Sequence, residues 1–169
     1  MKQFKAFTVK SNKRALAAIK TGVVVSARNG GRKEAVAVWD TGATVSRISN
    51  EVIKELGVSP FGYRYVGTAN GLMKCGKYEI SLYLPNSVVF QDIIVSGFSG
   101  GENIDMLIGM DIINAGDFSI TNANGVTVAS FRIPADTYHI DYVEMHRKSK
   151  FGRSIIDRLK KAHLKRTVG

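Results

Sequence analysis

The sequence predicts a mainly β fold with one or two short helices and a basic helical extension at its C-terminal end. Most of the stretch from Thr21 to Phe131 consists of short apolar and β-branched runs separated by turn residues. Beyond Pro134 the pattern becomes helical and rich in Lys and Arg. We therefore expect three parts: a basic N-terminal extension at residues 1–20, a β domain at residues 21–133 and a basic helical extension at residues 134–169.

The predicted strands form hairpins around turn dipeptides. Segments 23–27 and 35–39 flank Asn29-Gly30, a dipeptide that favours a tight hairpin turn. A second pair of alternating segments flanks Asn70-Gly71. Further strands are predicted at residues 88–97, 105–110, 118–122 and 126–133, the last two being joined by Asn124-Gly125.

Two helical segments interrupt the strands. Residues 49–57 have Ser49 or Asn50 as a helix N-cap and Gly57 where a C-terminal stop belongs. Residues 110–116 are long enough for a very short helix. In the C-terminal extension, four apolar residues fall on roughly one helix face: Phe151, Ile155, Leu159 and Ala162. This stripe indicates either packing on the β domain or a basic docking helix.

The net charge of +10 belongs to the two ends of the chain. Residues 1–33 hold nine Lys/Arg and no acid, and residues 139–169 hold nine Lys/Arg against three acids. The stretch between them holds six Lys/Arg against eleven acids. The ends, residues 1–33 and 139–169, are therefore expected either to bind nucleic acid or another acidic partner, or to serve only solubility.

Composition excludes several other classes of protein. No apolar run reaches the roughly 20 residues of a membrane span, so no membrane partner is expected. The N-terminal segment lacks the apolar stretch of a signal peptide, and Cys75 is the only cysteine. No Cys/His pairs have zinc-ligand spacing, so no metal is expected. We expect a cytoplasmic protein, or one within a virus or phage particle, and not a secreted one.

A carboxylate directly follows an apolar strand in the segment Val-Ala-Val-Trp-Asp-Thr-Gly, residues 36–42. Asp40 is thereby carried to the edge of the core, where burial costs free energy unless the carboxylate is hydrogen-bonded or shares a proton. Gly42 permits a tight turn whose N–H can point at the carboxylate, and Thr41 offers a hydroxyl for an inter-strand hydrogen bond. A lone Asp-Thr-Gly is also common as a surface turn. The apolar run before it and Ala-Thr-Val-Ser after it disfavour that interpretation.

Two further motifs follow in order. Residues 65–71 and the strand after them form a hairpin pattern, and residues 104–111 read Ile-Asp-Met-Leu-Ile-Gly-Met-Asp. Together with residues 37–44, these segments resemble the catalytic turn, the flap and the hydrophobic-hydrophobic-Gly-x-Asp motif of the retropepsin-like aspartic proteases. The resemblance covers about residues 20–132. It implies the closed-barrel-like acid protease fold.

The resemblance also implies an activity and a site. In these enzymes two aspartates share one proton and activate a catalytic water, with no other cofactor. This chain carries one Asp-Thr-Gly, so an active enzyme would be a homodimer that hydrolyses a polypeptide substrate. The implied catalytic residues are Asp40, Thr41 and Gly42, and the implied substrate-binding residues are Ala43, Ala69, Asn70, Gly71 and Leu107.

Some positions depart from the viral pattern. Viral members often carry an acid where Thr44 stands and an arginine where Met110 stands, which fits cellular, bacterial or phage members better. The extra residues at both ends also leave open how an intersubunit sheet would form. The alternative function is therefore a catalytically silent retropepsin fold that serves as a binding or assembly component, in a phage particle or nucleoprotein, through its basic ends.

Overall fold

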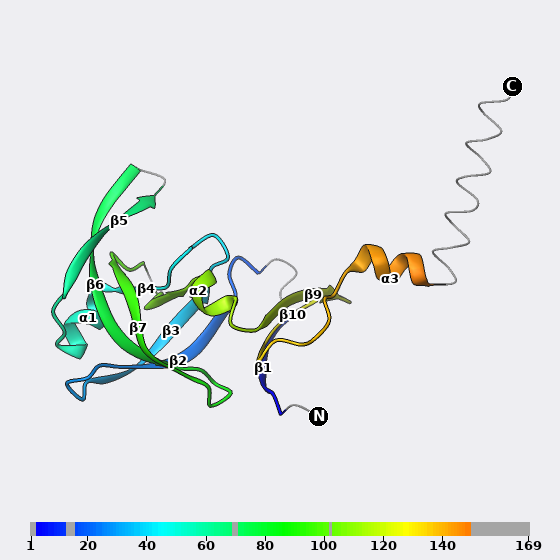
Figure 1. Ribbon diagram of the computed structural model, residues 1–169, viewed down its shortest axis with the longest axis horizontal. Coiled ribbons are helices and arrows are strands. Elements are labelled where there is room, and N and C mark those ends of the chain that lie inside the picture. Colours follow the sequence, from blue (N-terminus) through cyan, green and yellow to red (C-terminus); the bar gives the residue numbers. More distant parts are fainter. Residues whose placement is uncertain (1–2, 13–15, 69–70, 102, 150–169) are drawn as a thin grey trace, which may run out of the picture. The chain divides into compact units, whose positions relative to one another are not determined.

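The structure is a computed structural model that describes residues 3–12, 16–68, 71–101 and 103–149 (Figure 1). It divides into two compact units, Met1–Ala135 and Asp136–Gly169. The strands of the described residues are β1 (Lys5–Ser11), β2 (Lys20–Ser26), β3 (Arg32–Trp39), β4 (Arg47–Ser49), β5 (Gly62–Thr68), β6 (Gly71–Tyr83), β7 (Val89–Phe98), β8 (Met106–Ile108), β9 (Asp117–Ala123) and β10 (Val126–Ile133). The helices are α1 (Asn50–Leu56), α2 (Met110–Ile113) and α3 (Tyr142–Lys148). The prediction of a mainly β fold with few short helices is confirmed.

The larger sheet of the first unit has seven strands in the order β2-β3-β8-β4-β7-β6-β5. An additional pairing of β2 with β6 curls this sheet back on itself, which confirms the barrel-like closure (Figure 1). The short strand β8 runs parallel to β3 and antiparallel to β4. β8 therefore lies between β3 and β4, which are close together in sequence.

A second, three-stranded sheet has the order β1-β10-β9. The predicted turn at Asn124-Gly125 joins β9 to β10, with positive φ at both residues (50° and 77°), as a tight hairpin turn requires. The sequence pattern predicts no strand at residues 5–11, which fall in the predicted N-terminal extension. β1 is identified only by its pairing with the distant strand β10. All seven residues of β1 are exposed or half-buried, and lysines interrupt its apolar alternation.

An aromatic cluster joins the end of β3 to the three-stranded sheet. The Trp39 ring stacks on Phe118 with ring centroids 5.2 Å apart, and it also contacts Phe7 and Phe131. The Trp39 indole N–H donates to the Thr21 hydroxyl at 3.1 Å. Trp39 and Phe131 belong to the buried core, so the residue directly before Asp40 is firmly anchored.

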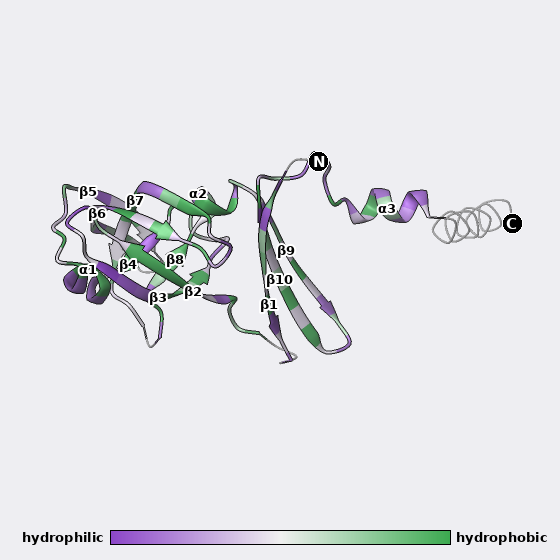
Figure 2. Cartoon of the chain, turned by 90° about the horizontal axis from the view of Figure 1, so that it is seen from below, coloured by the Kyte–Doolittle hydropathy of each residue, from purple (hydrophilic) through white to green (hydrophobic). Residues whose placement is uncertain are grey.

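The helix ends follow the predicted capping residues. Ser49 caps α1 by accepting from the Val52 N–H, and Gly57 ends the helix in the left-handed conformation (φ 65°). In the second unit, α3 begins at the N-cap Asp141 and buries none of its residues. Figure 2 shows hydrophobic and hydrophilic residues mixed along α3. The predicted apolar stripe from Phe151 to Ala162 lies outside the described residues. No helix in the described part of the chain is long and apolar enough to cross a membrane.

Candidate active site

Asp40 lies where β3 ends and a tight turn begins. Its backbone N–H donates to the carbonyl oxygen of Ile108 at 2.9 Å, which continues the β3–β8 pairing by one residue. Its carboxylate accepts from the Gly42 N–H at 2.9 Å, and the Ala43 N–H closes the turn onto the Asp40 carbonyl at 3.2 Å. The side chain is half-buried. The strand and the turn thus hold the carboxylate in one place while leaving it accessible.

Gly42 also sets the space around that carboxylate. A Cβ added at Gly42 would lie 3.2 Å from Asp40 Oδ1, which is tighter than an ordinary contact. Thr41 is exposed at the tip of the turn. The predicted catalytic residues are therefore contiguous on one turn, and the Gly42 N–H points at the carboxylate as the sequence predicts.

A second carboxylate supports the turn from behind. Asp111 accepts from the backbone N–H of Ser46 at 2.9 and 3.0 Å, from the Ser46 hydroxyl at 2.7 Å and from the Ile112 N–H at 3.0 Å. The Ser46 hydroxyl in turn accepts from the Gly109 N–H at 3.0 Å. Asp111 belongs to the predicted motif, whereas Ser46 is not among the predicted site residues. Ser46 is fully buried, so its polar groups need these partners.

Asp105 joins three strands by hydrogen bonds to backbone groups. Its carboxylate accepts from the Val36 N–H at 2.8 Å, and its own N–H donates to the Val36 carbonyl at 2.9 Å. Its carbonyl accepts from the Ser49 N–H at 2.8 Å. These bonds fix β3 and β4 on either side of the segment that enters β8, and so fix where Asp40 emerges.

The predicted substrate-binding residue Leu107 lies on the same face of the sheet as Asp40. Leu107 pairs with Val38 of β3, and both alternate with core residues such as Trp39 and Ile108. Side chains two residues apart share one face of a strand, so Val38, which is itself buried, Asp40 and Leu107 lie on the opposite side of the sheet from Trp39 and Ile108. We call this side of the sheet the Asp40 face.

The predicted flap is the β5–β6 hairpin. Gly71 opens β6 with a positive φ of 103° and pairs with Thr68. Ala69 and Asn70 lie outside the described residues. Large apolar side chains on one side of this hairpin are exposed, among them Tyr63, Tyr65 and Leu72.

A groove of about 660 Å³ lies elsewhere, between the β2–β3 hairpin and residues 83–89. None of the predicted site residues lines it. One wall is polar, with the Arg32 guanidinium over the Tyr83 ring. Within the described residues, no three His, Cys, Asp or Glu side chains cluster as metal ligands would.

A family of known proteins matches the part of the chain that contains this site. Residues 25–115 match the family described as "gag-polyprotein putative aspartyl protease", and this match spans more than half of the 169 residues. The chain belongs to this family. The matched region runs from β2 past α2 and includes the Asp40 turn, the β5–β6 hairpin and Asp111.

A solved structure shares this fold. A retropepsin-like aspartic protease from Rickettsia conorii superposes with a TM-score of 0.50 at 17% identity, covering 72% of this chain and 98% of the other. The protease of EIAV in complex with an inhibitor matches with a TM-score of 0.46 at 14% identity, covering 57% of this chain and 86% of the other. No curated protein matches the sequence significantly. The predicted retropepsin-like fold is confirmed.

Proposed function

We propose that the protein is an aspartic endopeptidase that is active as a homodimer, with one Asp40 from each chain. The single observation that carries this proposal is the position of Asp40, held at the end of β3 by Ile108 and Gly42 in a chain of the aspartyl protease family. Each chain contains one Asp-Thr-Gly turn and therefore supplies one carboxylate. Peptide hydrolysis by this chemistry needs two carboxylates that share a proton.

The reaction uses a water molecule and no other cofactor. The ionised Asp40 takes a proton from the water, whose oxygen attacks the scissile carbonyl carbon. The protonated Asp40 of the second chain donates to the carbonyl oxygen. When the carbon–nitrogen bond breaks, a proton passes to the leaving nitrogen. The Gly42 N–H, which already donates to the carboxylate, keeps it oriented throughout.

The polypeptide substrate binds in this proposal as an added strand between the Asp40 face and the flap. Leu107 then contacts a substrate side chain, and Ala43 and residues 69–71 contact its backbone. The support is the register of β8, which puts Leu107 beside Val38 on the Asp40 face.

The three-stranded sheet has two edges at which a partner chain can pair. In the three-stranded sheet, β10 is already paired on both sides, by β1 and β9. A second chain that extends this sheet must therefore pair with β1 or β9, since edge strands present free backbone groups. The apolar Ile120 on β9 is exposed.

The test combines cleavage and oligomeric state. Asp40→Asn should lower the rate of peptide cleavage at least a thousandfold while the sedimentation behaviour stays that of a dimer. The matched control is Asp92→Asn, because Asp92 is an exposed aspartate that pairs with Arg28. Cleavage by Asp40→Asn at the wild-type rate, or a strictly monomeric wild-type protein that still cleaves, would contradict the proposal.

A second candidate function is binding through the basic ends. The supporting observation is α3, whose residues are all exposed or half-exposed and whose last turn carries His146, Arg147 and Lys148. In this role, residues 1–33 and 139–169 bind nucleic acid or another acidic partner. Wild-type protein that binds such a partner but cleaves no peptide would favour this candidate.

A further inference from the structure

Arg47 lies on the Asp40 face, directly beside Leu107. It pairs with Leu107 across the β4–β8 ladder and with Ser96 across the β4–β7 ladder. The next residue, Ile48, is fully buried in the core, so Arg47 points to the opposite side of β4. Val38, Leu107, Arg47 and Ser96 thus form one continuous row across four neighbouring strands.

The Arg47 guanidinium has few partners for its five N–H donors. One terminal nitrogen donates to the Gly97 carbonyl at 3.1 Å and approaches the Cys75 sulfur at 3.6 Å. The Phe98 ring lies 5.5 Å from the guanidinium carbon. The Nε atom is buried without a hydrogen-bond partner, as is the hydroxyl of its register neighbour Ser96. Among the described residues, no carboxylate forms an ion pair with Arg47.

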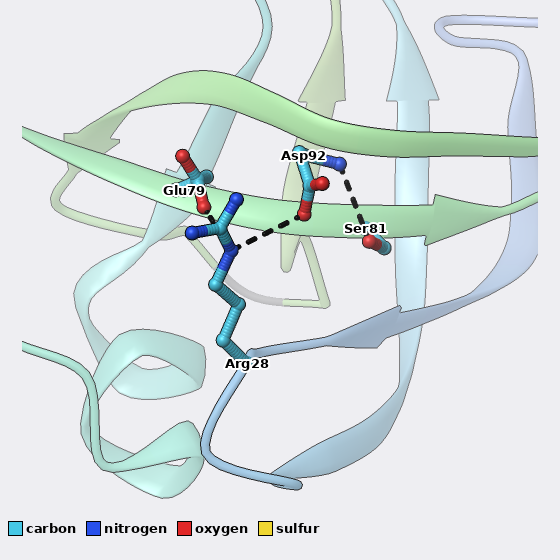
Figure 3. A network of polar contacts seen from close by, with 4 residues as sticks. All are labelled: Arg28, Glu79, Ser81 and Asp92. Atoms are coloured by element: carbon cyan, nitrogen blue, oxygen red, sulfur yellow. Dashed lines mark hydrogen bonds and ion pairs between the residues drawn. The ribbon is translucent and has the colours of Figure 1, made fainter.

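Arg28 provides a contrast to Arg47 within the same structure. Its side chain is exposed, yet it forms ion pairs with both Glu79 and Asp92 (Figure 3). The backbone N–H of Asp92 donates to the Ser81 hydroxyl in the same network. The better shielded arginine is therefore the one that lacks an anionic partner.

A partly buried guanidinium that has no counter-ion is a binding site for an anion. Arginine keeps its charge at any physiological pH, and a buried charge without a counter-ion costs free energy. Its planar fork matches a carboxylate, which can accept two parallel hydrogen bonds. We propose that Arg47 binds an acidic side chain of the polypeptide substrate and so makes the enzyme selective for Asp or Glu at one substrate position. This inference rests on the proposed function, which places the polypeptide on the Asp40 face.

The sheet geometry limits where that acidic residue lies. Arg47 is on β4, two strand spacings from β3, so about 10 Å separates it from the strand that carries Asp40. An extended peptide advances about 3.3 Å per residue. The selected Asp or Glu therefore lies within about three residues of the scissile bond.

The experiment separates peptide selection from catalysis. Octapeptide sublibraries, each with Glu or Gln fixed at one of the eight positions and the rest randomised, are passed over immobilised full-length Asp40→Asn protein, and the retained peptides are quantified by mass spectrometry. At one position, Glu should be retained about tenfold better than Gln. Adding Arg47→Met should reduce that ratio to about one, and Arg47→Lys should leave part of it. Arg28→Met is the matched control and should leave the ratio unchanged.

The outcomes are distinct from those of the catalytic test. Equal retention of Glu and Gln at all positions, a preference that survives Arg47→Met, or no retention of any sublibrary would overturn the role of Arg47. A preference that disappears with Arg47→Met would uphold it even if the wild-type protein cleaved nothing, in which case only the proposed activity would fail. Circular dichroism of each variant shows whether the fold is kept, and Arg47→Lys preserves the charge if Arg47→Met unfolds.

Discussion

Ser46 and Asp111 are joined by both the backbone N–H and the hydroxyl of Ser46, at 2.7 to 3.0 Å from the Asp111 carboxylate. The two residues are far apart in sequence, one after the Asp40 turn and the other in the first turn of α2. Because Met110 also donates its N–H to the Ala43 carbonyl at 2.8 Å, α2 holds the Asp40 turn at two points. The position of the Asp40 carboxylate therefore depends on a second carboxylate, that of Asp111.

Removal of that support should destabilise the protein. Asp111→Ala leaves the buried N–H and hydroxyl of Ser46 without their acceptor, and we expect a loss of about 3 kcal/mol in the free energy of unfolding. Urea denaturation followed by tryptophan fluorescence measures it. Glu55→Ala is the control: Glu55 is an exposed partner of Lys33, so its loss should cost less than about 1 kcal/mol. Equal losses for both variants would show that the Asp111 bonds do not stabilise the turn.

Gly109 should not tolerate any side chain. A Cβ there would lie 2.8 Å from the Ala43 carbonyl oxygen and 2.8 Å from the Val45 carbonyl carbon, which are both backbone atoms. Gly109→Ala must therefore push the Asp40 turn away, and we expect a loss of about 2 kcal/mol or more together with the loss of cleavage. Gly22→Ala meets nothing within 4 Å and should keep both stability and activity. A fully active Gly109→Ala protein would refute this account of the turn.

Substitutions of Trp39, the aromatic residue that anchors the end of β3, should destabilise the protein to different degrees. Trp39→Ala removes a buried ring that stacks on Phe118, and we expect a loss of about 3–5 kcal/mol. Trp39→Phe keeps much of the apolar contact but loses the bond to Thr21, so its loss should be smaller. Phe61→Ala removes an exposed ring and should have little effect on stability. Thermal unfolding of the three variants gives the order, and a Phe61→Ala loss as large as that of Trp39→Ala would contradict it.

Removal of residues 139–169 should change binding and not folding. The deletion lowers the net charge from +10 to +4, because it takes away nine Lys/Arg and three acids. Affinity for a DNA duplex should fall, and its dependence on salt concentration should become shallower. A variant with the same nine Lys/Arg replaced by Gln separates charge from the loss of chain. Unfolding of the first unit on truncation would instead make the segment part of its core, although α3 buries no residue.

Local signals in the sequence determined much of this structure. The hairpin at Asn124-Gly125, the caps Ser49 and Gly57 and the turn after Asp40 each depend on residues that are close together in the chain. The backbone conformations that Gly and Asn permit, and the hydroxyl that caps a helix, act over four residues or fewer. The order of the three motifs was likewise sufficient to predict the family and the barrel-like fold.

The tertiary structure alone decided which distant residues meet. Strand β1, the Ser46–Asp111 bonds and the place of Arg47 beside Leu107 all depend on cross-strand register. An arginine between the two buried residues Ser46 and Ile48, in a short strand after the Asp40 turn, is a signal that could have drawn attention to Arg47. Its meaning could not be deduced, because the sequence does not say which strand lies beside it or whether a carboxylate is within reach. Register is fixed by the packing of the whole core, and that is why the neighbours of the partly buried Arg47 are defined only in the folded chain.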